Sequence, residues 1–173
     1  LLSYGEVQKL LRDLPKDSNE PYWTSPLPAY SHVVMQIEDD EVWREFLRFA
    51  LANDVARLTV PGKALYSCML NDSAGVVDDL IAYFFRDDFF RLVVNAGTAD
   101  ADIQWLHSLN ALAGHAVSIR PREEMAMVAV QGPNAREKFW RAFDETKPAT
   151  EALAPFHAAR MGDDIMVART GYT

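Results

Sequence analysis

The sequence has a single cysteine, Cys68, among its 173 residues. One cysteine cannot form a disulfide within the chain, and it cannot build a thiolate metal site without several histidines nearby. The four histidines are far apart in sequence, and no two of them have the spacing of a ligand pair. We therefore expect no metal site and a reducing compartment, either the cytosol or an organelle matrix, with a cytoplasmic location as the prediction.

Long apolar runs and a basic surface are also missing. No apolar stretch approaches the roughly 18 residues of a membrane span, and the opening residues lack the basic flank and apolar centre of a signal peptide. The formal net charge is -8 and the 17 Lys and Arg residues are scattered, which argues against nucleic acid as a partner. The 49% hydrophobic and 24% charged residues are typical of a soluble globular protein and indicate no function.

Residues 1–30 read differently from the rest. A short amphipathic pattern stops at Pro15, and Pro21, Pro26 and Pro28 punctuate an extended stretch. We predict a divergent N-terminal arm here. The first residue is Leu rather than Met, so we also expect this terminus to be processed, cut or borrowed from another protein.

From residue 31 onward, periods of about 2 and 3.6 residues alternate. They predict strands at 32–38, 64–70, 75–85, 89–95, 115–119, 125–130, 156–160 and 165–168, and helices at 41–53, 100–113 and 133–143. In the first helix, one face gathers Trp43, Phe46, Leu47, Ala50 and Leu51. Short polar turns join neighbouring strands, so we predict an α+β fold with a mostly antiparallel sheet and packed helices.

The sharpest local feature is Asp78-Asp79 inside an apolar strand. Alternation sends the two carboxylates to opposite faces, so one of them is poorly placed for mere solubility. A carboxylate in a partly dry cleft keeps its charge only with hydrogen-bond or cationic partners, which is the setting of acids, bases and cation stabilisers. The plain alternative is that both aspartates cap the preceding turn or edge the sheet, and spacing alone favours it.

Aromatic residues offer a second, weaker signal. Tyr66, Tyr83 and Tyr172 fall on expected strands or at a strand end, where flat rings could sandwich a heterocycle. Core packing is the default reading for all three. Cys68 in a strand is more often a small buried hydrophobe than a nucleophile.

Six motifs occur in one order along the chain. They are Gly62-Lys63-Ala64-Leu65-Tyr66-Ser67, Met69-Leu70-Asn71, Gly75-Val76-Val77-Asp78-Asp79-Leu80-Ile81, Leu92-Val93-Val94-Asn95-Ala96, Val130-Gln131-Gly132-Pro133 and Thr170-Gly171-Tyr172-Thr173. Together they resemble the N-terminal part of the glycine cleavage T-protein family, the folate-dependent aminomethyltransferases. The likeness runs from Ser31 to Thr173.

The resemblance implies a ferredoxin-like second domain and part of a first domain, from a three-domain disc that holds folate in its central hole. It also implies a reaction in which the aminomethyl group on the lipoyl arm of the H-protein passes to tetrahydrofolate, giving methylenetetrahydrofolate and ammonia. Asp78 would be the catalytic residue that orients folate and stabilises positive charge. Tyr66, Tyr83, Asn95 and Tyr172 would help to line the folate site, with no metal.

Two departures from the family pattern bear on activity. The residues before Ser31 are unlike the family's opening, and the family sequence continues well beyond the Gly-Tyr-Thr motif at which this chain ends. We therefore expect residues 31–173 to form a partial folate-binding region with an incomplete folate cage. Two alternatives stay open: a folate-binding module of the demethylase type, and a non-catalytic folded remnant that binds a partner through its arm.

Overall fold

The computed structural model describes residues 32–36, 40–115, 117–122, 125–162 and 165–171. The expected arm at 1–30 and Tyr172 lie outside these residues. In chain order the elements are β1 (His32–Gln36), α2 (Asp40–Ala50), η1 (Val55–Arg57), β2 (Ala64–Leu70), β3 (Val76–Arg86), β4 (Phe89–Val94), α3 (Ala99–Ala113), β5 (Ser118–Pro121), α4 (Ala135–Ala142), η2 (Asp144–Thr146), α5 (Lys147–Thr150), β6 (His157–Met161) and β7 (Ile165–Arg169).

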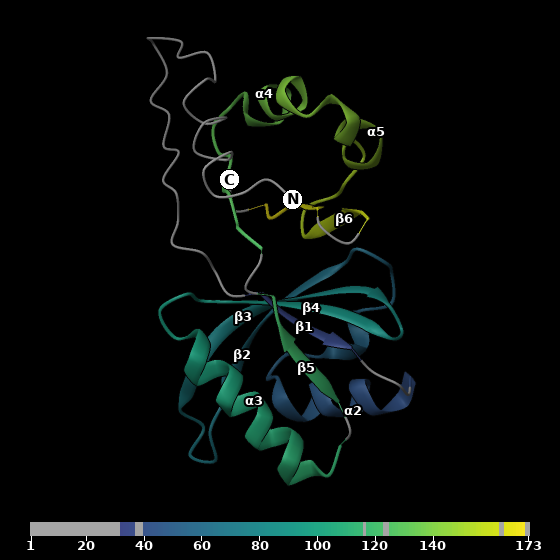
Figure 1. The fold of residues 1–173 in the computed structure, drawn as a ribbon. Helices are drawn as coiled ribbons and strands as arrows, with labels where there is room; N and C mark the ends of the chain where they lie inside the picture. Colours follow the sequence, from purple (N-terminus) through teal and green to yellow (C-terminus); the bar gives the residue numbers. More distant parts are fainter. Residues whose placement is uncertain (1–31, 37–39, 116, 123–124, 163–164, 172–173) are drawn as a thin grey trace.

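Five strands form one antiparallel sheet in the order β2-β3-β4-β1-β5 (Figure 1). The expected hairpin between β2 and β3 is present and is closed by Asn71, whose side-chain oxygen accepts hydrogen bonds from the amides of Ser73 (3.0 Å) and Gly75 (2.8 Å). A side chain that replaces backbone acceptors in this way is the reason that Asn favours turns. The prediction of an α+β fold with a mostly antiparallel sheet is confirmed.

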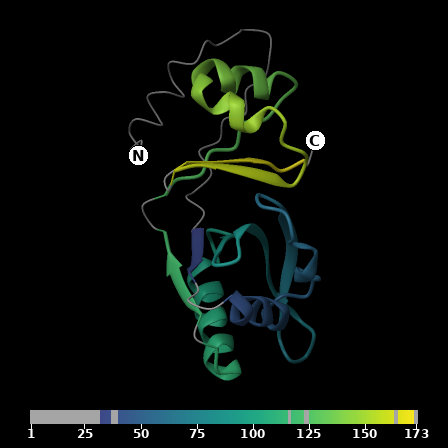
Figure 2. The same cartoon turned by 90° about the vertical axis from the view of Figure 1, so that its right-hand side faces the viewer.

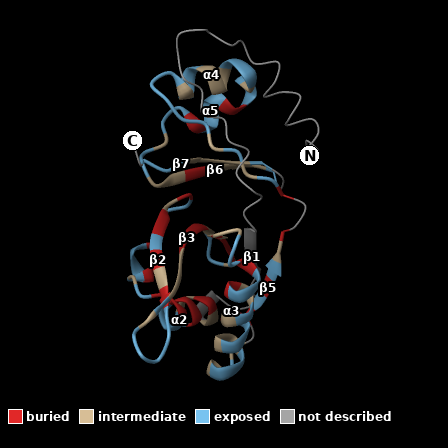
Figure 3. Cartoon of the chain, turned by 90° about the vertical axis from the view of Figure 1, so that its left-hand side faces the viewer, coloured by how far each residue is buried: buried red, intermediate tan, exposed pale blue. Residues whose placement is uncertain are grey.

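Helices α2 and α3 cover one face of this sheet, and the main core lies between them and the strands (Figures 1 and 3). The apolar face expected here is confirmed, because its five residues, four in α2 and Leu51 directly after it, are at most 5% exposed. Trp43 is fully buried, with its ring centroid 3.8 Å from that of Phe90. Burial of such side chains contributes roughly 1.5–3 kcal/mol each, so this face fixes α2 on the sheet.

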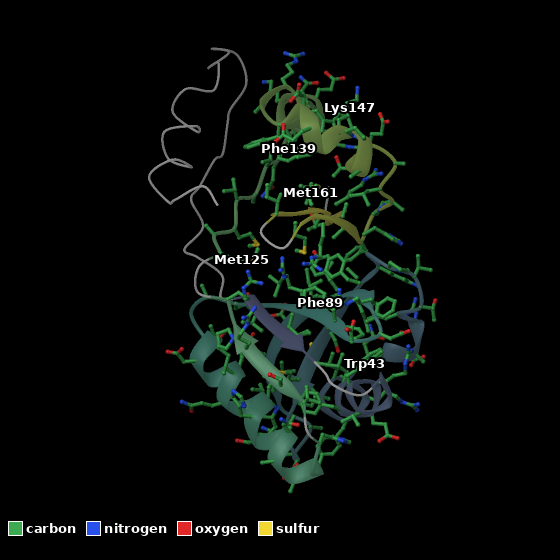
Figure 4. The ribbon with its side chains drawn as sticks, turned by 45° about the vertical axis from the view of Figure 1, so that its right-hand side comes forward. Trp43, Phe89, Met125, Phe139, Lys147 and Met161 are labelled. Carbon is green, nitrogen blue, oxygen red and sulfur yellow. The ribbon has the colours of Figure 1, made fainter. Side chains whose placement is uncertain are left out.

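The hairpin β6–β7 lies over the opposite face of the sheet, with α4 and α5 beyond it (Figures 1 and 2). A second apolar cluster joins the two sheets; it contains Ala64, Tyr83 and Ala158 as its buried members. Gly62 makes the close approach possible: it has φ +84°, and a Cβ there would lie 2.2 Å from the carbonyl oxygen of Ala158. In Figure 4, Trp43 lies on the helix side of the sheet and Phe89 on the side of the hairpin.

Several expectations from the sequence differ from the structure. The strand expected at 115–119 is β5 at Ser118–Pro121, and the helix expected at 41–53 ends at Ala50. Residues 125–130 form no strand among the described residues, although burial alternates from Met125 (9% exposed) to Val130 (45%). Alternating burial indicates an extended chain, but a strand also needs a neighbouring strand with which to form hydrogen bonds. Helix α4 begins at Ala135 rather than Pro133, because Gly132 has φ +119° and its carbonyl closes a turn onto the amide of Ala135 (3.1 Å).

Among the described residues, no helix combines the length and apolar character that crossing a membrane requires.

Candidate functional site

Asp78 and Asp79 lie near the start of β3 and point to opposite faces of the sheet. Asp78 pairs across the ladder with Met69, and Asp79 pairs with Cys68. Since Met69 is fully buried in the main core, Asp78 belongs to the face that the helices cover. It lies where that row of side chains passes beyond the core, and it is half-buried. The alternation expected from the sequence is therefore present, and it places one carboxylate beside the helix layer.

Three donors hold the Asp78 carboxylate. Its Oδ1 accepts hydrogen bonds from the backbone amide of Asp79 (2.8 Å) and from Asn95 Nδ2 (2.9 Å). Its Oδ2 accepts the hydroxyl of Thr98. Burial by itself would raise the pKa of Asp78, but the hydrogen bonds from Thr98, Asp79 and Asn95, with one from Asp102 when that group is protonated, outweigh burial and lower it. Asp78 therefore carries a negative charge at neutral pH in a partly dry setting.

Asn95 follows the end of β4 and ties the two aspartates together. Its Nδ2 also lies within 3.2 Å of Asp79 Oδ1 and 3.3 Å of the Asp79 carbonyl oxygen. All of these neighbours are acceptors only, so they fix the amide with its NH2 group toward β3. The atom of Asn95 that remains for a ligand is Oδ1, which can accept a hydrogen bond.

The next part of the site is the start of α3. The helix begins after Thr98, whose carbonyl accepts the first-turn bond from the amide of Asp102 (2.9 Å). The Thr98 hydroxyl does not cap the helix, because it donates to Asp78. Acidic residues in a first turn are favoured by the helix dipole, so the sequence gives α3 an ordinary start. That start brings a second carboxylate, Asp102, toward Asp78.

Asp102 is only 1% exposed. Neither of its carboxylate oxygens accepts a hydrogen bond of ordinary geometry among the described residues, although the Thr98 hydroxyl lies close enough to oppose part of the rise in its pKa. Burial, followed by the negative charge of Asp78, raises the pKa of Asp102 to about 6. Two ionised carboxylates cannot hydrogen-bond each other, whereas a protonated Asp102 can donate to Asp78. The same contact therefore lowers the pKa of one group and raises the pKa of the other.

The tyrosines expected at the site lie elsewhere on the sheet. Tyr66 and Tyr83 belong to the face that carries Asp79, opposite the face of Asp78. Tyr66 is 44% exposed, whereas Tyr83 is 3% exposed in the second apolar cluster, with its ring stacked 6.4 Å from that of Phe85. Tyr172 lies outside the described residues. The structure thus brings Asp78 and Asn95 together, and it places Tyr66 and Tyr83 on the face of the sheet opposite to Asp78.

Sequence reasoning missed Thr98 and Asp102 as members of the site. Both stand where helix starts ordinarily place Thr and Asp, so their residue types carried no signal beyond capping and dipole effects. Only the spacing from Asn95 to Thr98 and on to Asp102, three and then four residues, could have suggested a common cluster around the strand end.

Chemically, the site offers acceptors rather than nucleophiles. Asp78 supplies a fixed negative charge, and Asn95 Oδ1 is an acceptor on the residue that holds this carboxylate. Such a pair can bind N–H groups and stabilise a positive charge. Among the residues that the structure describes, no group of three or more His, Cys, Asp or Glu is arranged to hold a metal ion.

Comparisons with known proteins agree on one family. Residues 42–173 match the model of the GCVT N-terminal domain. The chain is 60% identical over 128 residues to an aminomethyltransferase of Bordetella petrii, covering 74% of this chain and 35% of the relative. It is 52% identical over 147 residues to an aminomethyltransferase of Paraburkholderia phymatum, covering 83% and 40%.

A solved structure is similar as well. The crystal structure of glycine cleavage system aminomethyltransferase T from Bartonella henselae superimposes with a TM-score of 0.65 at 30% identity, covering 83% of this chain and 37% of that protein. The chain therefore spans between a third and two fifths of the length of these relatives.

Proposed function

Because this chain belongs to the family of GCVT N-terminal domains, we propose that it supplies the catalytic carboxylate of a tetrahydrofolate-dependent aminomethyl transfer. In this reaction, the aminomethyl group carried on the lipoyl arm of the H-protein passes to tetrahydrofolate. The products are methylenetetrahydrofolate, ammonia and the dihydrolipoyl protein. The chain spans only part of its relatives, so the transfer is proposed for the whole assembly to which this region contributes.

One observation carries the proposal: Asp78 is half-buried and yet held ionised. Three hydrogen-bond donors fix its orientation, and together they lower its pKa. A fixed negative charge costs no reorganisation when positive charge develops beside it, which is the main way that enzymes stabilise cationic transition states. Transfer of a one-carbon unit from sulfur to nitrogen passes through a carbon that carries such positive charge.

The residues present fit a folate ring. The fixed negative charge of Asp78 can attract a ring N–H group, and Asn95 Oδ1 can accept a hydrogen bond from a second one. In this proposal Asp78 orients the reactive nitrogen and handles its proton, and Asn95 aligns both the ring and Asp78. Tyr66, Tyr83 and Tyr172 remain proposed folate-lining residues from the family resemblance, and the exposed ring of Tyr66 is the more accessible of the two described.

The proposal is tested by transplanting residues 42–173 into the Bordetella petrii aminomethyltransferase in place of its matching segment. Ammonia release is measured with aminomethylated H-protein and tetrahydrofolate. Loss of one electrostatic or proton-handling group costs about 100-fold or more in rate, so we expect that loss for Asp78→Asn in the chimera. The matched control is Asp72→Asn, an exposed aspartate in the β2–β3 turn, which should retain full activity.

An Asp78→Asn chimera as active as the Asp72→Asn chimera would refute the catalytic role. Binding is measured separately, by titrating tetrahydrofolate into the 173-residue chain and following tryptophan fluorescence. Weaker binding in Asp78→Asn than in Asp72→Asn supports direct contact between folate and Asp78.

A further inference from the structure

The least expected group near the site is Asp102. Its side chain is 1% exposed, and both carboxylate oxygens are buried and accept no hydrogen bond of ordinary geometry among the described residues. An unpaired ionised carboxylate in such a place costs several kcal/mol, so a group of this kind either finds a cation or takes up a proton. The two ion pairs found among the described residues involve Asp87 and Asp88, not Asp102.

One residue, Thr98, links Asp102 to Asp78 by hydrogen bonds. The carbonyl oxygen of Thr98 accepts a hydrogen bond from the backbone amide of Asp102 (2.9 Å), and the Thr98 hydroxyl donates one to Asp78 Oδ2. The charged groups that act on Asp102 from β3 are Asp78 and Asp79, both negative, and Thr98 is the polar group from the start of its own helix. Among the described residues, the charges acting on Asp102 are both negative, and the opposing effect of the Thr98 hydroxyl is smaller than that of burial, so protonation relieves the burial of this carboxylate.

We propose that Asp102 is a positioning residue for Asp78, and that the two carboxylates share one proton, which resides on Asp102. Protonated Asp102 donates toward Asp78 and leaves the negative charge on the carboxylate that faces the ligand. When Asp102 ionises, the pair carries two negative charges and the hydrogen bond between them is lost. The pKa of about 6 for Asp102 puts this change just below neutral pH.

The inference deepens the proposed function, on which it rests for the identity of the ligand, but the sharing of the proton does not depend on folate. It is measured on the 173-residue chain without any ligand, by following the side-chain carboxyl carbons of Asp78 and Asp102 by NMR from pH 3 to pH 8. Three variants accompany the wild type: Asp102→Asn, Asp78→Asn, and the control Asp100→Asn, an exposed aspartate in the same first turn.

In the wild type, we expect Asp102 to titrate near pH 6, and we expect the Asp78 signal to show a second step at that same pH, as coupled groups do. Asp102→Asn should abolish that second step, and Asp78→Asn should move the Asp102 midpoint to lower pH. Asp100→Asn should change neither. If Asp102→Asn does not fold, as judged by loss of amide dispersion, the proposal is still tested by whether Asp78→Asn lowers the titration midpoint of Asp102.

Two results would overturn the proposal. One is an Asp102 pKa near its ordinary value of about 3.9, and the other is an Asp102 titration midpoint that does not change in Asp78→Asn. A functional arm uses the chimera with Bordetella petrii: its kcat/KM should inflect near pH 6, and Asp102→Asn should remove the inflection. A buried residue with only a structural role would lower activity at every pH and leave the profile unchanged. Shared titration in the 173-residue chain, together with full activity of the Asp78→Asn chimera, would refute the proposed function alone.

Discussion

The replacement Asp102→Asn should flatten the dependence of stability on pH. Burial and the charge of Asp78 raise the pKa of Asp102 in the folded protein from 3.8 to about 6. A raised folded pKa means that the stability gained from Asp102 is fully present below the unfolded pKa, and that it is lost as pH rises through the folded pKa. The wild type should therefore become less stable between pH 4 and pH 6.

The magnitude follows from the pKa difference. Between the 3.8 of the unfolded chain and the value of about 6 in the fold, the shift corresponds to at most about 3 kcal/mol, at 1.36 kcal/mol for each unit of pKa. Asp78 acts in another window, because its folded pKa is lowered from 3.8. The stability that Asp78 provides is lost only as pH falls through that lower value.

The assay is denaturation by urea at several values between pH 4 and pH 8, for the wild type, Asp102→Asn and Asp100→Asn. We expect the free energy of unfolding of the wild type to fall by about 1–3 kcal/mol across this range relative to Asp102→Asn. Asp100→Asn should follow the wild type, because Asp100 is exposed. Parallel curves for the wild type and Asp102→Asn would show that Asp102 ionises in the fold as easily as in the unfolded chain, and would refute the reasoning.

Three further outcomes are expected. Trp43→Ala removes a fully buried ring from the face of α2 and should cost about 3–5 kcal/mol in thermal or urea unfolding, whereas a loss below 1 kcal/mol would mean that α2 is not fixed by this face. Gly62→Ala puts a Cβ 2.2 Å from the carbonyl oxygen of Ala158 at φ +84° and should cost about 1–3 kcal/mol; hydrogen exchange should quicken in β6, and unchanged exchange there would contradict the close approach. Thr98→Val removes a donor to Asp78 and should raise the pKa of Asp78 in an NMR titration, and a pKa that stays the same would show that the hydroxyl bond is not made in solution.

The elements could largely be predicted from the sequence, because their periodicities are local properties of the chain. The face of α2 around Trp43 and the hairpin closed at Asn71 follow from spacing and turn chemistry. The run 125–130 could not be assigned in this way, since a strand exists only when a neighbouring strand supplies hydrogen bonds. The order of strands in the sheet, with β1 between β4 and β5, is likewise set by contacts distant in sequence.

By itself, the sequence determined that one of Asp78 and Asp79 must leave the solvent-facing side, because successive strand residues alternate. It also carried the motifs of the family to which the chain belongs. Only the tertiary structure decided which aspartate faces the helices, and only it brought Thr98 and Asp102 to Asp78. The physical reason is that the charge state of a carboxylate depends on burial and on neighbours within a few ångströms, and packing assembles those neighbours from separate strands and helices.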